Sequence, residues 1–97
     1  MTEVRISDKN LRRFGHAVFD SVGIPKKIYK TVVDGLVETS LRGVDSHGVR
    51  LIPHYVRAAI IGRINTNPKL SFKKTGLSTG ILDANNGYGI AAGTEAM

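Results

Sequence analysis

Apolar residues recur at helical spacing in the first third of the chain. Ser7 is a good N-cap, and Ile6 and Leu11 stand at the two positions of a hydrophobic staple. The apolar positions that follow with a period near 3.6 are Leu11, Phe14, Val18 and Val22. Gly23 supplies a left-handed stop. The pattern therefore predicts a first helix over residues 8–22.

A second helical pattern follows directly. Pro25 suits the first turn of this helix, and Gly43 ends it. Its core-facing side is broad and consists of Ile28, Val32, Val33, Leu36, Val37 and Leu41. Gly35 interrupts this side at a cost of about 1 kcal/mol relative to alanine, which indicates that a neighbouring helix crosses close by. The short junction at residues 23–25 makes the first two helices antiparallel neighbours.

A third helical pattern begins after Asp45 and Ser46 and stops at Gly62. Its apolar positions are Val49, Ile52, Val56, Ala59 and Ile60. Pro53 lies inside this pattern, where it lacks a hydrogen-bond donor and clashes with the preceding turn. We therefore expect the helix to kink or to restart at this proline.

After residues 65–68 the period changes from that of a helix to that of a strand. Leu70 and Phe72 alternate with polar residues, as in a strand with one solvated face. A turn is expected at residues 75–76 and a second strand at residues 79–83. The sequence thus predicts a short hairpin after the helices.

The last stretch resembles the opening of a further helix. Asn86 and Gly87 signal a turn, and residues 89–97 have an apolar start and no C-terminal stop. We expect an α+β fold with three helices, a short β-hairpin and the start of another helix, as in the front of a larger protein. Residues 1–65 are expected to form an N-terminal helical region, and residues 66–97 to begin a second, sheet-containing domain.

Composition narrows the class of protein. The 97 residues include no cysteine, which excludes a disulfide framework, a zinc knuckle and a thiol nucleophile. A hydrophobic content of 41% and a charged content of 23% are typical of a globular chain. The longest apolar run, residues 58–61, is too short to span a bilayer or to form a signal-peptide core. We therefore expect a cytoplasmic protein with no membrane partner.

The net charge of +6 suggests that the chain could bind nucleic acid. The cations are spread along the chain in runs of at most two, and aromatic residues make up only 6% of it. This pattern favours a solvated surface, so we expect no nucleic-acid partner. A small basic helical module that binds nucleic acid stays as an alternative, as does a catalytically inactive interaction module.

Candidate chemistry gathers where one helix is expected to end and the next to begin. Asp45 or Ser46 would cap the new helix, whose free N–H groups and positive dipole end favour a bound anion. His47 lies in its first turn, and a histidine can donate or accept a proton near neutral pH. Arg50 and Arg57 lie seven apart, near one helical face, where guanidinium groups could hold a carboxylate.

These are the parts of a small-acid site, an anion clamp beside a proton donor. From spacing alone an alternative stays open, in which Asp45 and Ser46 only cap the helix and His47 lies on the surface.

A Ser–His–Asp relay is excluded, because sequence neighbours project in different directions. His47 and His54 are too far apart along a helix to chelate one ion without a third ligand, and His16 is expected to pack or to lie at the surface, so we expect no metal site.

Residues 87–92 fit the pattern G-x-G-x-x-A of a dinucleotide-binding turn. The preceding segments, however, read as a hairpin and not as the opening of a βαβ unit. The alternative is a turn glycine followed by a glycine needed for close packing. The pattern alone therefore assigns no cofactor-binding residue.

Several segments together resemble the malate/L-lactate dehydrogenase family, which also includes ureidoglycolate, sulfolactate and diketogulonate dehydrogenases and is unrelated to the Rossmann-type enzymes. The most specific of them is R-G-V-D-S-H-G at residues 42–48. The looser ones are P-H-Y-V at 53–56, G-R-I-N at 62–65, I-L-D at 81–83, G-Y-G at 87–89 and A-M at 96–97. The resemblance covers nearly the whole chain.

The resemblance implies an oxidoreductase that depends on NAD or NADP and interconverts small 2-hydroxy acids and 2-oxo acids, as a homodimer. In this family the histidine of the S-H-G motif donates a proton to the substrate carbonyl, a role that maps onto His47. Ser46 would orient that histidine or the substrate, and Arg50 would hold the substrate carboxylate. In many members the arginine lies one position later, where this chain has Leu51.

The resemblance also implies a helical N-terminal portion followed by a larger domain with an unusual, non-Rossmann sheet. Full members are much longer than this chain, and their nicotinamide site and a second catalytic histidine belong to other segments. We therefore expect a fragment of that fold, with the cofactor site mostly outside these 97 residues. The chain alone is expected neither to bind cofactor nor to turn over substrate.

Overall fold

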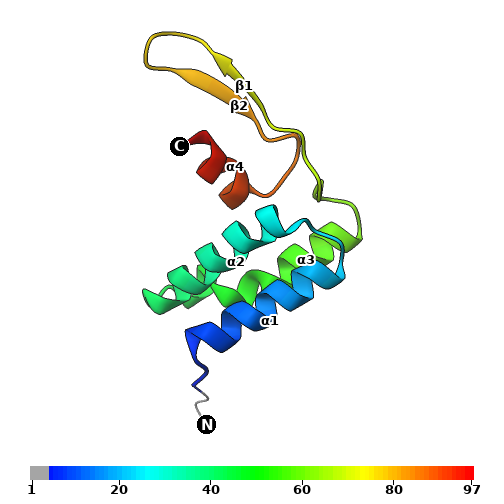
Figure 1. The fold of residues 1–97 in the computed structure, drawn as a ribbon. Helices are drawn as coiled ribbons and strands as arrows, with labels where there is room; N and C mark the ends of the chain where they lie inside the picture. The colour runs from blue at the N-terminus through cyan, green and yellow to red at the C-terminus, as the bar shows by residue number, and fades with distance from the viewer. Residues whose placement is uncertain (1–4) are drawn as a thin grey trace.

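The computed structural model describes residues 5–97, which fold into helices and one hairpin (Figure 1). In chain order the elements are α1 (Asp8–Ser21), α2 (Lys26–Leu41), the 3₁₀ turns η1 (Asp45–His47) and η2 (Val49–Leu51), α3 (Ile52–Ile60), β1 (Ser71–Lys74), β2 (Gly80–Asp83) and α4 (Gly89–Ala96). This order confirms the expected α+β class. None of the helices within residues 5–97 has the length and apolar character needed to cross a membrane.

Helix α2 is the centre of the core. It packs against α1, α4 and both 3₁₀ turns, and α1 runs beside it as the predicted neighbour (Figure 1). The side chains with at most 2% exposure are Phe19, Ile24, Val32, Val33, Leu36 and Val37, four of which come from α2. The broad apolar side that the sequence predicts for this helix is thus its buried side, except that Leu41 is 59% exposed at its last residue.

Three helices end in the same way, at the predicted glycines. Gly23, Gly43 and Gly62 have φ of 85°, 85° and 80°, the left-handed conformation that glycine adopts without a steric penalty. After α2, the Gly43 amide donates to the Ser40 carbonyl at 2.9 Å, and the next amide donates to the Thr39 carbonyl at 3.2 Å. This pair of bonds is a Schellman motif, and equivalent bonds close α1 and α3.

The apolar spacing predicts Phe14 on the buried side of α1, and this prediction is wrong. Phe14 is 59% exposed, whereas Phe19 is fully buried. The face of α1 that meets α2 is centred on Gly15, where a Cβ atom would lie only 2.7 Å from Val33 Cγ1. Because each residue turns the helix by about 100°, Phe14 lies beside that face and Phe19, four residues after Gly15, lies on it.

Gly35 confirms the predicted close crossing. A Cβ atom at this position would lie 3.2 Å from Cγ2 of Ile90, so α4 approaches the backbone of α2 directly. The segment that the sequence predicts over residues 89–97 is therefore a helix that packs on the central one.

Pro53 restarts the third helix, as predicted. It lies in the first turn of α3, where its missing N–H has no helical partner to lose. The residues before it, 45–51, form two 3₁₀ turns instead of the expected continuous α-helix. The break falls at Gly48, whose φ of −105° and ψ of −139° are not helical, whereas Ile52 before the proline is already in the α conformation.

The hairpin projects beyond α1, α2 and α3, and α4 lies between it and α2 (Figure 1). Its strands are antiparallel, and Phe72 pairs with Leu82 while Lys73 pairs with Ile81. Within residues 5–97 neither face is buried, since Phe72 and Ile81 are 63% and 61% exposed. The expectation of a single solvated face is therefore wrong for the described part of the chain.

Two asparagines fix the base of the hairpin. Asn85 and Asn86 have φ of 50° and 60°, which places the predicted turn at this point. The Asn65 side-chain amide donates to Asn85 Oδ1 at 2.8 Å, and the Asn86 side-chain amide donates to the Arg63 carbonyl at 2.8 Å. These bonds tie the chain after α3 to the chain before α4.

Candidate active site

Residues 42–50 connect the end of α2 to α3, and their local structure differs from the expected one. The turn η1 has Val44 at its N-cap and no side-chain capping bond, so neither Asp45 nor Ser46 caps a helix. Gly48 separates η1 from η2 with φ −105° and ψ −139°. A three-residue turn has no aligned set of free N–H groups, so the expected anion site at a helix start does not form.

His47 lies exposed at the end of η1. Its Nδ1 is 2.8 Å from the Ser46 hydroxyl, with donor and acceptor set by the tautomer of the ring. The expectation that these sequence neighbours point apart is thus wrong for this pair. Within residues 5–97 Asp45 makes no side-chain hydrogen bond to either group, so the three residues form no relay. The second ring nitrogen, Nε2, has no hydrogen-bond partner in this part of the chain.

The two arginines lie on different elements. Arg50 belongs to η2 and Arg57 to α3, and both are exposed. Their seven-residue spacing predicts a shared face only on one continuous helix, and the helix begins between them, so that argument no longer applies. Leu51 packs on the core. Of positions 50 and 51, only Arg50 therefore has an exposed side chain.

The pattern missed one residue that contacts this segment. The hydroxyl of Ser40, in the last turn of α2, accepts a hydrogen bond from the Val49 amide at 2.9 Å. The two residues are nine positions apart, and a serine near a helix end has no spacing rule that would predict such a partner.

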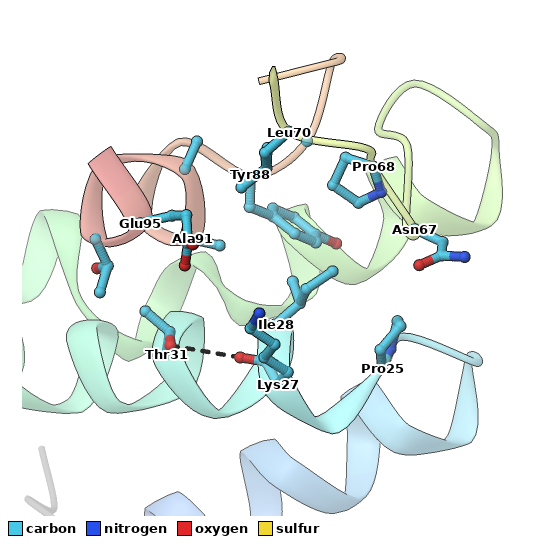
Figure 2. A pocket seen from close by; sticks show the side chains of 13 residues that line it. Pro25, Lys27, Ile28, Thr31, Asn67, Pro68, Leu70, Tyr88, Ala91 and Glu95 are labelled. Carbon is cyan, nitrogen blue, oxygen red and sulfur yellow. Dashed lines mark hydrogen bonds between the residues drawn. The ribbon is translucent and has the colours of Figure 1, made fainter. Parts of the chain in front are cut away.

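A cavity of about 440 Å³ lies near the other end of α2, between that helix, residues 67–70 and α4 (Figure 2). The residues that line it include Ile28, Thr31, Pro68, Tyr88, Ala91 and Glu95. His47 does not line it. Thr31 is ten residues before the end of α2, which is about 15 Å of helix. The cavity and the candidate proton donor are therefore separate features within residues 5–97.

Residues 87–92 do not fit a dinucleotide. The strand before them belongs to an antiparallel hairpin, not to a parallel βαβ unit. Gly87 packs against Pro68, since a Cβ there would lie 2.7 Å from Pro68 Cγ and 3.1 Å from the Ala84 carbonyl. The residue between the two glycines, Tyr88, is buried and donates a hydrogen bond to the Tyr55 carbonyl at 2.8 Å. Gly87 thus serves the turn and close packing, but a Cβ atom at Gly89 would have nothing within 4 Å, so the expectation that the second glycine is needed for close packing is wrong.

His16 belongs to a polar cluster between α1 and α2. Its Nε2 lies 3.5 Å from Asp34 Oδ1, and its ring centroid lies 5.5 Å from that of Tyr29. Burial raises the pKa of Asp34, but hydrogen bonds from Arg12 and Lys30 outweigh burial, so the pKa is lower than usual. This histidine packs, as expected. Among residues 5–97 no three side chains of His, Asp or Glu are placed to hold a metal ion.

The family model described as malate/L-lactate dehydrogenase matches residues 6–97. The chain belongs to this family. The malate dehydrogenase of Pyrococcus abyssi is 36% identical over 94 residues, which are 97% of this chain and 26% of that protein. The structure of malate dehydrogenase from Pyrococcus horikoshii OT3 superposes with a TM-score of 0.90 at 35% identity, over 95% of this chain and 26% of that one.

Sulfolactate dehydrogenase from Methanocaldococcus jannaschii superposes with a TM-score of 0.87 at 28% identity, over 94% of this chain and 26% of that one. The chain therefore spans about a quarter of the length of each of these relatives. The fold is that of a piece of a larger dehydrogenase, and the family consists of oxidoreductases. These relatives lend no support to the nucleic-acid alternative.

Proposed function

We propose that residues 1–97 are the N-terminal part of an NAD(P)-dependent oxidoreductase that interconverts small 2-hydroxy acids and 2-oxo acids. The observation that carries this proposal is the match of the malate/L-lactate dehydrogenase family over residues 6–97. The relatives are named for malate and sulfolactate, and both compounds are 2-hydroxy carboxylates with a second acid group.

In this proposal His47 donates a proton to the substrate. When a 2-oxo acid is reduced, its carbonyl oxygen gains negative charge and needs a proton, which a positioned histidine can supply. The 2.8 Å contact between the Ser46 hydroxyl and Nδ1 supports an orienting role for Ser46. A histidine that donates a proton carries one on each ring nitrogen, so Nδ1–H then donates to the Ser46 hydroxyl, and the proton to be transferred is on Nε2, the nitrogen without a partner in residues 5–97.

Arg50 holds the substrate carboxylate in this proposal. It lies three residues after His47, and its side chain is exposed rather than packed on the core. A guanidinium can bind a carboxylate through two parallel hydrogen bonds, which fixes orientation as well as position.

The nicotinamide cofactor is expected to be held by other parts of the complete protein. The cofactor would supply the reducing equivalents of the reaction. Residues 87–92 do not support a role in binding it, because the strand before them is antiparallel and Gly87 packs against Pro68. We further propose that the complete protein is a homodimer, as the resemblance of its motifs implies, and that it is cytoplasmic.

We also propose a domain boundary near residue 65, with residues 66–97 beginning the cofactor-binding domain. The support is the hairpin, whose apolar side chains Phe72, Leu77 and Ile81 are exposed. An isolated two-stranded sheet is only marginally stable in water, so these strands require further strands or a covering layer.

The central test is His47→Asn in the complete protein, assayed with oxaloacetate and either NADH or NADPH. Loss of a positioned general acid is expected to lower kcat by about 10²–10⁴ with unchanged circular dichroism. His54→Asn is the matched control, because His54 is also exposed and lies outside the proposed site. A His47→Asn variant within about threefold of the wild type would remove His47 from the mechanism.

Arg50→Ala should chiefly raise KM for the 2-oxo acid, because it removes binding of a group that does not react. Arg57→Ala, on α3, should change KM less. Steady-state kinetics of the two variants give the comparison. If Arg57→Ala has the larger effect, the carboxylate is held from the face of α3 instead of from η2.

A further inference from the structure

Ser40 contacts the segment that carries His47 in two ways. Its hydroxyl accepts a hydrogen bond from the Val49 amide at 2.9 Å, and its carbonyl accepts one from the Gly43 amide at 2.9 Å. Gly43 precedes η1 and Val49 follows it. One residue in the last turn of α2 therefore holds the chain on both sides of His47.

Gly48 supplies the second part of this contact. It is buried, and a Cβ atom there would lie 3.0 Å from both the Cβ and the backbone nitrogen of Ser40, besides colliding with the Ser40 hydroxyl. The backbone nitrogen cannot move without disturbing α2. Gly48, the residue after His47, therefore packs directly against Ser40, and the space between them is too small for the Cβ atom of any other residue type.

His47 has little other support. Every residue of η1 is exposed, and the His47 amide bonds only to the Val44 carbonyl, at 3.1 Å, within the same loop. The one side chain bonded to its ring is Ser46, which is itself exposed. Within residues 5–97, the side chains of Val49 and Leu51 also pack on the core after η1, and the Val44 amide bonds to the Thr39 carbonyl before it. The side chain of α2 that reaches the residues directly after His47 is that of Ser40, which contacts Gly48 and accepts from the Val49 amide.

We propose that Ser40 is a positioning residue for His47. It acts through its hydrogen bond with the Val49 amide and through its close contact with Gly48. The proposal rests on the proposed role of His47 as proton donor. A donor in an exposed loop samples many orientations unless its backbone is held, and orientation of the donor enters the rate directly. The Ser40 hydroxyl supplies that restraint from a helix that belongs to the rigid core.

The test compares Ser40→Ala and Ser40→Thr in the complete protein, with Thr39→Ala as the matched control. Thr39 is also part-buried in the last turns of α2, but its hydroxyl donates to the Gly35 carbonyl of the same helix, at 2.8 Å. Loss of one hydrogen bond should lower kcat about fivefold in Ser40→Ala, whereas Ser40→Thr, which keeps the hydroxyl, and Thr39→Ala should stay within about twofold.

Amide hydrogen exchange provides a readout that does not depend on activity. The Val49 amide should exchange about fivefold faster in Ser40→Ala and be unchanged in Thr39→Ala. If Ser40→Ala does not fold, Ser40→Cys takes its place, because a thiol of similar size is a much weaker acceptor.

The outcomes separate this proposal from the one on which it rests. A Ser40→Ala variant with wild-type kcat, together with an inactive His47→Asn variant, overturns the positioning role. Unchanged exchange at Val49 overturns it as well. If His47→Asn is active while Val49 exchange is faster in Ser40→Ala, the proposed function fails and the restraint by Ser40 is structural only.

Discussion

Tyr88 joins α4 to the rest of the core through one hydrogen bond and two aromatic contacts, with Phe19 and with Tyr55. Its hydroxyl donates to the Tyr55 carbonyl at 2.8 Å, and its ring lies edge-on to Phe19 with centroids 6.0 Å apart. Only 4% of the residue is exposed. Burial, with a smaller contribution from the charge of Tyr55, raises the pKa of Tyr88 to about 12. The neutral phenol is therefore the form that the folded chain stabilises.

This shift predicts a fall in stability at high pH. The unfolded phenol has a pKa of 10.0 and loses its proton first, so the stabilisation is complete below pH 10 and is lost as the pH rises through about 12. The loss should reach about 2–3 kcal/mol. Unfolding by urea at several pH values measures it. Tyr88→Phe should remove this part of the pH dependence, whereas Tyr55→Phe, which keeps the accepting carbonyl, should retain most of it.

At the scale of elements, the glycine that ends α2 places the loop with His47. Gly43→Ala would force a side chain into the left-handed conformation at φ 85° and should cost about 1–2 kcal/mol in the free energy of unfolding. Gly93→Ala is the control, because Gly93 lies inside α4 with nothing within 4 Å of a new Cβ atom. That change should be neutral or should stabilise the chain by up to about 1 kcal/mol. Equal losses in the two variants would contradict the argument.

Helix ends could be predicted from the sequence because their signals are local. A glycine one or two residues after the last apolar residue of a helix determines the Schellman bonds by itself, and Gly23, Gly43 and Gly62 all behave in this way. The choice between Phe14 and Phe19 could not be made locally. The glycine at position 15 counts as neither apolar nor polar, yet it marks the face where α2 approaches.

The structure of the candidate site likewise could not be predicted from local sequence signals alone. A capping role for Asp45 or Ser46 is a good local inference, but the non-helical backbone of Gly48 breaks the segment into two 3₁₀ turns and removes the helix start. The group that supports the segment is Ser40, nine residues before its partner amide. Such a contact depends on how the chain returns to α2, which periodicity along the sequence does not encode.

For the molecule as a whole, the isolated chain of residues 1–97 should bind no NADH. The reason is that residues 87–92, the one segment with a dinucleotide-like pattern, are taken up by the turn after β2 and by packing against Pro68 and α2. Isothermal titration calorimetry of the isolated chain should give no binding heat, with the complete protein as the positive control. One-to-one binding by the isolated chain would contradict this expectation.

The projecting hairpin stretches the molecule to 53 × 28 × 19 Å and has a consequence for its behaviour at high concentration. Both outer edges of the two-stranded sheet have unpaired backbone groups, and Phe72 and Ile81 lie uncovered beside them. Such edges recruit strands from neighbouring molecules and lead to aggregation. Lys73 and Lys74 stand in the same strand, and their like charges oppose the stacking of one copy on another. These lysines therefore act as gatekeepers, and their replacement by neutral residues would make the isolated chain precipitate sooner.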